Sequence, residues 1–440
     1  MKTNKKTDTN KLKINNMKKQ YLLFALLFAA IQFAQAQFSI DGQLRPRTEY
    51  RNGFGTLIPE DSEPGYGIST RVRLNAGYES ETYKAYISLQ DVFVWGENRQ
   101  ILPYDQNNSF AIFEAWAAIK LGSGWNTKLG RQVLSYDDQR ILGGLDWAQQ
   151  GRNHDAGLIT YKKNDFALDV ALAFNQDYSN PTGFISEGNE YNTSGFFSYK
   201  TMYMAHLSQK WGAFSGSLLL MNNGFQDDDA GLNDIANLQT MGVHLKYGKN
   251  AFSLAANLYL QTGEAIYGTS YKDVKGGFLS SLDFGFKASD KIALGVGAEI
   301  ISGNGESDPG STSAFFPLYG TNHKFNGFMD YFYVGNHANS IGLIDVHVSA
   351  NFKFNDTTSL LVKALNFSGE EELPSGDKAL GTEIDLVFAK KFKGYALKIG
   401  YSQMFASEGM YELKGVPEVD ADNIQNWAWA MLVFKPKFLN

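Results

Sequence analysis

The stretch ISTRVRLNAGY, residues 68–78, alternates between two kinds of side chain. Its even positions carry apolar or small residues, and its odd positions up to 75 carry Ser69, Arg71, Arg73 and Asn75. Successive side chains of a β-strand point to opposite faces, so this period of two predicts a strand with one apolar and one charged face. Such a strand is typical of a barrel that turns an apolar face to lipid and a polar face to a water-filled lumen.

The same alternation runs through much of the chain, at 38–51, 166–174, 278–286 and 384–388 among other places. Short polar turns are predicted at 79–82, 122–124, 162–165, 209–212, 248–250, 288–290, 354–356 and 391–393. Longer loops are predicted near 52–66, 96–109, 134–155, 176–197, 222–237, 261–275, 302–340, 367–379 and 405–424. Eight short and nine long connections imply eighteen strands, and an extra hairpin around Phe328–Val334 would add two.

The predicted fold class is all-β: a single transmembrane antiparallel barrel of about eighteen strands, with short periplasmic turns and long extracellular loops. Closure of the last strand, Trp427–Phe434, against the first is required because lipid offers no partner for an open sheet edge. Aromatic residues near the predicted strand ends suit interfacial girdles: Tyr50, Tyr78, Tyr203, Tyr247, Tyr259, Tyr401, Trp427 and Trp429. A secreted β-solenoid or β-sandwich is the alternative.

The N-terminus has the pattern of a secretory signal. Lys18 and Lys19 precede an apolar run at 21–31, and Ala34-Gln-Ala36 forms the expected cleavage site. We therefore predict residues 1–36 to be an N-terminal extension and cleavable signal peptide, with translation starting at Met17, and residues 37–440 to be the outer-membrane barrel. Beyond the signal, no window approaches eighteen uninterrupted apolar residues, which argues against a helical membrane span. The expected location is the outer membrane of a Gram-negative cell.

Charge and cysteine content exclude several classes of protein. Of the 40 basic and 46 acidic side chains, residues 1–36 hold seven lysines and one aspartate, which leaves 33 and 45 and a formal charge of −12. This negative charge argues against nucleic-acid binding. The chain has no cysteine, so no disulfide framework supports the exported protein.

Arginine is confined to the first third of the chain. The nine arginines are residues 45, 47, 51, 71, 73, 99, 131, 140 and 152, and lysine alone supplies positive charge thereafter. Strand parity turns four of them to the lumen on adjacent strands, where planar guanidinium groups suit carboxylates. The predicted pore-lining or substrate-binding residues are Arg45, Arg47, Arg71, Arg73, Arg131, Arg140 and Arg152. Arginines that merely line a wet wall, or that lie near lipid headgroups, remain the simpler interpretation.

Carboxylates occupy inward positions on later strands. This opposite acidic wall consists of Asp169, Asp283, Glu299, Asp345, Glu383 and Asp385. A basic wall facing an acidic wall would create a transverse field across the lumen, which serves general diffusion of small polar solutes as well as passage of anions.

Residues 129–157 concentrate charged side chains among glycines and aromatics. After the fifth strand, Ser135–Asp155 is predicted to be a loop that folds inward and narrows the pore, with Gly143 and Gly144 permitting a tight reversal. The loop-anchoring candidates, expected to pair with Arg131, Arg140 and Arg152, are Asp137, Asp138, Asp146 and Asp155.

This stretch resembles the alginate-export family of outer-membrane barrels. The resemblance rests on Gly130–Gln132, Tyr136, Arg140, Trp147 and Gly151–Ala156. A second block, Gly303–Gly305 through Phe316–Asp330, is similar to Bacteroidota-type members. The resemblance implies an eighteen-stranded barrel whose arginine-rich constriction passes a polyanionic uronate chain out of the periplasm. Periplasmic export partners are a further expectation. Arg131, Arg140 and Arg152 match the family's motif arginines, whereas the acidic lumen positions depart from a dedicated polyanion pore.

Motifs for other chemistry are missing from the sequence. The six histidines form no pair at the spacing of a zinc site, no G-x-S-x-G elbow occurs, and no glycine loop for phosphate precedes a helix. We therefore expect no catalytic residues, no metal site and no cofactor. The leading hypothesis is a channel for anionic saccharides. The alternatives are a general diffusion porin for small polar solutes and an adhesin or receptor that uses its loops. The expected partners are outer-membrane lipid or lipopolysaccharide and the solute itself.

Overall fold

A computed structural model describes residues 37–98, 100–101, 109–175, 199–226, 235–267, 270–422 and 424–439. The predicted signal peptide at 1–36, Arg99 and the whole of the predicted 176–197 loop lie outside the described residues.

Eighteen strands form the wall of the barrel within the described residues, as the sequence predicts. They are β1 (Phe38–Asn52), β2 (Gly65–Glu79), β3 (Tyr83–Val94), β4 (Ala111–Gly122), β5 (Trp125–Gln132), β6 (His154–Lys163), β7 (Phe166–Phe174), β8 (Thr201–Trp211), β9 (Phe214–Gln226), β10 (Ile235–Lys249), β11 (Phe252–Tyr267), β12 (Ser270–Lys287), β13 (Ile292–Ile301), β15 (Leu343–Asn355), β16 (Thr358–Ser368), β17 (Ala379–Lys391), β18 (Tyr395–Ala406) and β19 (Gln425–Phe434). Two short strands add to this wall: β14 (Ser311–Thr312) pairs with β12, and β20 (Lys437–Leu439) pairs with β1.

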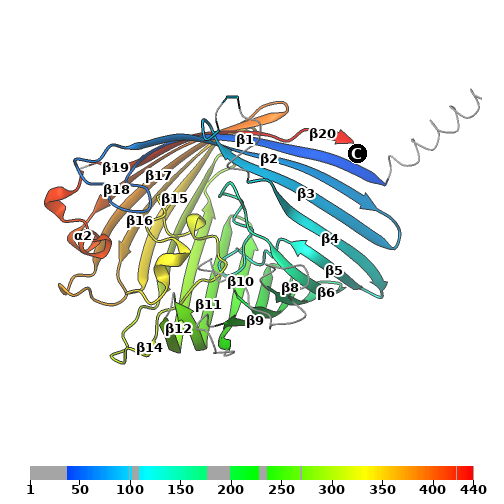
Figure 1. Cartoon of the computed structure of the whole chain (residues 1–440), viewed down its shortest axis with the longest axis horizontal. Helices are drawn as coiled ribbons and strands as arrows, with labels where there is room; N and C mark the ends of the chain where they lie inside the picture. Colours follow the sequence, from blue (N-terminus) through cyan, green and yellow to red (C-terminus); the bar gives the residue numbers. More distant parts are fainter. Residues whose placement is uncertain are drawn as a thin grey trace, which may run out of the picture.

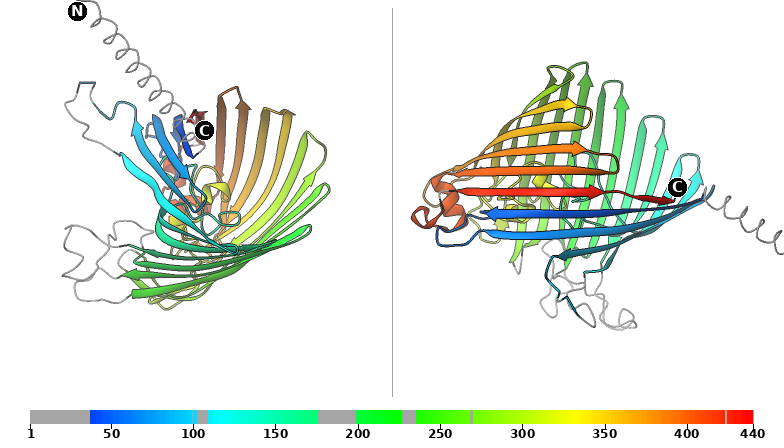
Figure 2. Two further views of the ribbon diagram at one scale, coloured as in Figure 1. Left: turned by 90° about the vertical axis from the view of Figure 1, so that its right-hand side faces the viewer. Right: turned by 90° about the horizontal axis from the view of Figure 1, so that it is seen from above.

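The barrel closes because β19 pairs antiparallel with β1, for example Arg47 opposite Met431. Each of the remaining wall strands pairs with the next wall strand in the chain, and the views show the strands following one another around the wall (Figures 1 and 2). Closure leaves no backbone edge unpaired in lipid. The extra hairpin considered around Phe328–Val334 is not formed, because this segment lies inside the barrel between two short 3-10 turns, η2 (Asn322–Lys324) and η3 (Val334–His337).

All eight predicted short turns connect strands at one end of the barrel. The prediction of a long loop at 261–275 is wrong, because β11 and β12 continue as a long hairpin up to the pair Tyr267 and Ser270. Isoleucine, tyrosine, threonine and valine in this stretch favour a strand over a loop. The neighbouring β14 adds a parallel pairing to β12 at Asp273 and Val274, which further supports the extended tip.

The outer face is apolar, as a lipid-facing surface requires. Leu74, Leu129 and Val348 are exposed there. Tyr50, Tyr203 and Tyr401 are also exposed, in agreement with the predicted girdles, and Tyr78 and Tyr247 are half-buried.

The girdle assignment is wrong for three aromatic residues. Tyr259, Trp427 and Trp429 are buried. They face the interior, where Trp427 and Trp429 pack against Trp147. The described residues contain no helix with the length and apolar character needed to cross a bilayer.

Two long loops fold into the barrel and pack against each other. We call residues 133–153 and 302–342 together the inner plug. Leu142 and Tyr319 form a parallel bridge, and the Gly143 N–H donates to the Tyr319 carbonyl at 2.9 Å. The plug has its own apolar core, since Leu134, Ile141 and Phe315 are fully buried. In Figures 1 and 2 the yellow residues of the second loop lie enclosed by the wall strands.

Candidate functional site

Four arginines project from β1 and β2 into the barrel. Arg45 lies opposite Arg71 in the strand register, and Arg47 and Arg73 each lie two residues along the same face. Leu44, Val72 and Leu74, on the opposite face, are exposed to lipid. Strand parity therefore places this set, which we call the arginine cluster (Arg45, Arg47, Arg71 and Arg73), on the interior face, as the sequence predicts.

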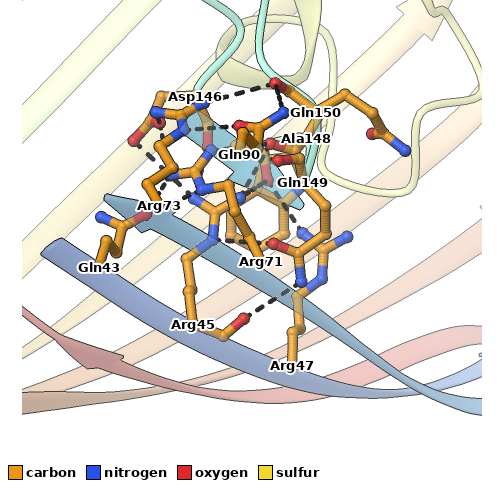
Figure 3. A network of polar contacts seen from close by, with 11 residues as sticks. Gln43, Arg45, Arg47, Arg71, Arg73, Gln90, Asp146, Ala148, Gln149 and Gln150 are labelled. Carbon is orange, nitrogen blue, oxygen red and sulfur yellow. Dashed lines mark hydrogen bonds and ion pairs between the residues drawn. The ribbon is translucent and has the colours of Figure 1, made fainter. Parts of the chain in front are cut away.

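The arginine cluster holds the end of the first plug loop by its backbone. Arg45 donates to the carbonyls of Asp146 at 2.6 Å and Ala148 at 2.9 Å. Arg47 donates to the Trp147 carbonyl at 3.0 Å, and Arg71 reaches the carbonyls of Ala148 and Gln149 at 3.4 and 3.3 Å. Figure 3 shows these side chains converging on the segment from two neighbouring strands. The guanidinium groups are fixed in direction because carbonyl oxygens satisfy several of their donors.

The Asp146 carboxylate sits among three of these guanidinium groups. It lies 2.7 Å from Arg71, 3.5 Å from Arg73 and 3.8 Å from Arg45. Partial burial works to raise the pKa of Asp146, but the nearby charges of Arg71 and Arg45 outweigh it and hold the pKa below its usual value. One carboxylate thus balances three arginines, and the site keeps an excess of positive charge.

Polar side chains outside the predicted set complete this cluster. Gln43 accepts from Arg71 at 2.8 Å, Gln90 accepts from Arg73 at 2.6 Å, and Gln149 accepts from Arg45 at 3.0 Å. Strand parity predicts that Gln43 and Gln90 point inward, but an uncharged glutamine gives no sequence signal for a binding site. The Arg73 guanidinium also lies 3.6 Å above the Phe113 ring, which fixes it further.

A cavity adjoins the arginine cluster on each side. The extracellular cavity, of about 520 Å³, is lined by Arg47, Arg51, Ser69, Trp147 and Gln149 among others. The periplasmic cavity, of about 300 Å³, is lined by Gln43, Arg73, Asn75, Glu114 and Lys435 among others. The arginine cluster and the plug segment 146–150 therefore lie between two hollows along one wall of the barrel.

Arg140 and Arg152 join the two plug loops. Arg140 is fully buried, and it donates to Asn322 at 3.0 Å, to Asn326 at 2.9 Å and to Glu299 on β13. Arg152 donates to the carbonyls of Tyr319 and Gly320. These contacts give both residues an anchoring role inside the plug.

Arg131 departs from its predicted pore-lining position. It lies on the outer face of β5, because it shares the parity of exposed Leu129, whereas the adjacent Gln132 is fully buried. Its partner is Asp155 on β6, at 2.8 and 2.9 Å in a two-pronged ion pair. The motif that contains Arg131 predicts a pore position, whereas strand parity in β5 places it with Leu129 on the outer face.

Most of the predicted acidic wall is closed to the lumen. Glu299, Asp345, Glu383 and Asp385 are at most 5% exposed. Asn326 of the plug donates to Glu299 at 2.8 Å and to Asp345 at 3.3 Å, and the Met329 N–H donates to Glu383 at 2.8 Å.

The fit of the plug over this wall is close. Gly327 has φ +86°, and a Cβ there would lie 2.5 Å from the Glu383 carboxylate. Asp283 pairs with His347 at 3.0 Å, and Asp169 is half-buried. The two remaining acidic positions are therefore the only ones of the six predicted that keep appreciable exposure.

Three of the four loop-anchoring aspartates, Asp137, Asp138 and Asp146, have other partners than predicted, whereas Asp155 pairs with Arg131 as expected. Asp137 accepts from His206 at 3.0 Å and from Ser217 at 2.7 Å, and Asp138 accepts from Asn257 at 2.7 Å. Wall side chains on β8, β9 and β11 thus replace the predicted arginines at Asp137 and Asp138, while the Asp155–Arg131 pair lies on the outer face. No sequence signal linked these distant strands to the loop.

The role predicted for Gly143 and Gly144 is also wrong. Neither glycine has a positive φ, and the positive-φ positions in this loop are Asp137, Gln139, Leu145 and Gly151 instead. Gly143 serves close packing, because a Cβ there would lie 2.3 Å from Thr321 Oγ1 in the second plug loop. Among the described residues, no group of three or more potential metal-ligating side chains gathers at one place.

Comparison with known proteins adds a family and a fold. The family model described as alginate export matches residues 36–412. A search of curated proteins gives no significant match. Among solved structures, OccAB4 of Acinetobacter baumannii is 13% identical with a TM-score of 0.60, over 91% of this chain and 98% of that one. OccK9 (OpdG) of Pseudomonas aeruginosa is 12% identical with a TM-score of 0.62, over 92% and 100% of the two chains. OpdQ of the same organism is 13% identical with a TM-score of 0.58, over 91% and 99%. At these identities the likeness concerns the fold.

Proposed function

The chain belongs to the alginate export family, and from that premise we propose that it is an outer-membrane channel that passes anionic, carboxylate-bearing saccharides along its arginine-lined wall. The observation that carries the proposal is the arginine cluster, four inward guanidinium groups on adjacent strands between two cavities. A channel must bind its solute well enough to admit it and weakly enough to release it. Arginines already engaged by backbone carbonyls offer directed but incomplete coordination, which suits that balance.

The charge distribution favours anions over a general transverse field. Arg45, Arg71 and Arg73 share a single carboxylate, whereas the carboxylates of Glu383 and Asp385 are sealed beneath the plug. A carboxylate sealed beneath the plug makes no direct contact with a passing solute, whereas Arg47 and Arg73 each line a cavity and can contact one. The general diffusion porin is therefore the second candidate, favoured only by the partly exposed Asp169 and Asp283.

The inner plug bears on the size of the solute. It packs against the arginine cluster, β13 and β17, and leaves cavities of about 520 and 300 Å³ beside the cluster. Pockets of a few hundred cubic ångströms take small ligands. We infer that single acidic sugars or short oligouronates fit the plug as it stands, and that a longer uronate chain needs the plug to move.

The test is ion selectivity in planar bilayers. In a KCl gradient at neutral pH, the purified, folded protein should give a reversal potential shifted toward the equilibrium potential of chloride, which indicates that chloride permeates more readily than potassium. Short oligouronates should then reduce the chloride current, and a neutral oligosaccharide of equal length should reduce it much less. A cation-selective channel would contradict the proposal, and the absence of any conductance would favour a receptor role for the loops.

A further inference from the structure

Asp146 and its three arginines differ sharply in exposure. The side chains of Arg45, Arg71 and Arg73 are 4%, 0% and 12% exposed, whereas that of Asp146 is 70% exposed. Among the described residues, Asp146 is the carboxylate within ion-pair distance of all three. One side of this carboxylate therefore rests on buried guanidinium groups, and the other side faces open space in the lumen.

We propose that Asp146 is a built-in occupant of a carboxylate-binding site formed by Arg45, Arg71 and Arg73, and that a solute carboxylate passes by displacing it. The inference rests on the proposed function and adds to it an internal competitor that sets the affinity of the site. Its ligand class is the carboxylate of a uronate ring, the same group that Asp146 supplies.

The arginines are held independently of the Asp146 side chain. Arg45 is bonded to backbone carbonyls of the plug, Arg71 donates to Gln43 at 2.8 Å, and Arg73 lies on the Phe113 ring. The backbone of Asp146 is likewise fixed by Arg45. Only the short Asp146 side chain needs to turn, so the site stays in place while its occupant changes.

The exchange keeps the charge of the site constant. A solute carboxylate brings one negative charge and Asp146 takes one away, so no buried guanidinium group is left without a partner, which would be costly. Asp146 is already mostly in contact with the lumen, and its move into water requires little further change in hydration. The reverse swap expels the solute, so the same residue limits how long the solute stays.

The position of the site matches a transfer step. Arg47 and Ser69 line the extracellular cavity, and Arg73 lines the periplasmic one. The two terminal nitrogens of Arg73 have only long contacts, 3.5 Å to Asp146 and 3.4 Å to the Gln150 carbonyl. An incoming carboxylate from the periplasmic cavity meets that fork before it meets Arg71.

The test compares Asp146→Asn with Asp146→Glu and with Asp61→Asn in bilayers, using sodium glucuronate to block the chloride current. Asp146→Asn removes the competing charge, so its half-blocking concentration should fall by about tenfold and its chloride preference should rise. Asp146→Glu keeps the charge and should behave nearly as the original protein. Asp61→Asn removes an equal charge from an exposed loop and should change neither value. Heat-dependent migration on gels confirms that each variant is folded.

The two proposals fail in different ways. If the unmutated protein is cation-selective, the proposed function as an anion channel is overturned, and this inference with it. A chloride-selective original protein whose block by glucuronate is the same in Asp146→Asn overturns only the inference. A large, unselective pore in Asp146→Asn also overturns it, because Asp146 would then be a structural tie of the plug and not a competitor.

Discussion

The wall at β1 and β2 and the wall from β13 to β17 carry opposite charges, and they differ even more in what covers them. At β1 and β2, the arginine cluster contacts a plug segment and has a cavity on each side. From β13 to β17, Glu299, Asp345, Glu383 and Asp385 lie beneath the second plug loop. Four arginines and four carboxylates thus lie in different surroundings, the first beside cavities and the second beneath a packed loop.

Inward parity alone therefore does not make a residue part of a pore. Both sets of side chains point inward and are largely buried, but Arg47 and Arg73 each line a cavity, whereas the four carboxylates line neither of these cavities. A buried carboxylate is retained by hydrogen bonds from the plug, such as that from Asn326 to Glu299, and serves to seat the loop. A guanidinium group beside a cavity keeps attraction to spare for a solute.

The largest effect is expected from breaking the tie between the plug and the acidic wall. Arg140→Met leaves Glu299 buried without its cation, a change that costs about 3–5 kcal/mol in buried pairs. Since closing a barrel does not depend on this pair, the plug should loosen while the wall remains, and single-channel conductance should rise several-fold. Arg131→Met, which breaks a half-exposed ion pair on the outer face, is the matched control. Unchanged conductance in Arg140→Met would show that the plug is held by other contacts.

A second test removes the basic wall. Replacing Arg45, Arg47, Arg71 and Arg73 together by serine should lower the chloride preference by about tenfold, equivalent to about 1.4 kcal/mol. The same four positions as lysine keep the charge and lose the planar fork, so they should retain chloride preference but bind uronate less well. Selectivity that survives in the serine variant would place the selective charges elsewhere.

Much of the fold could be predicted from the sequence because strand period and turn composition are local signals. The closed wall, all eight short turns and the inward parity of Arg45 and Arg71 follow from them. The contacts of the plug could not be predicted, since Arg140 and Glu299 are 159 residues apart and no local pattern links them.

The errors have physical causes as well. Trp427 and Trp429 are aromatic residues at a strand end, which suits a membrane girdle and a lumen contact equally, and the plug that decides between them lies far away in the chain. Strand parity predicts the outward direction of Arg131, whereas the sequence motif that contains it suggests a position in the pore.

A smaller effect is expected on the acidic wall. Glu383→Gln should change the chloride-to-potassium permeability ratio by less than about twofold, because the group is sealed beneath the plug and makes no contact with passing ions. Asp283→Asn, which is partly exposed, is the comparison. A marked rise in chloride preference for Glu383→Gln would mean that the acidic wall does act on the lumen.

The smallest effect concerns pH. The pKa of Asp146 is held below its ordinary value, chiefly by Arg71 and Arg45 acting against partial burial. A carboxylate with a lowered pKa keeps its ion pairs above its unfolded value of about 3.9 and loses them only as pH falls through the lower folded value. Block by glucuronate should therefore be constant from about pH 7 to about pH 5, where the sugar acid is also ionised. A change within that window would assign the block to another titrating group.

If selectivity resides on the wall formed by β1 and β2, as we claim, two charge-matched variants should differ in their reversal potentials. Arg73→Gln removes one positive charge beside the periplasmic cavity, and Lys363→Gln removes one from β16, where Lys363 donates to the Phe325 carbonyl of the plug at 2.9 Å. Reversal potentials in the same KCl gradient should show reduced chloride preference for Arg73→Gln and little change for Lys363→Gln. Equal shifts in both variants, or a larger shift in Lys363→Gln, would contradict the claim.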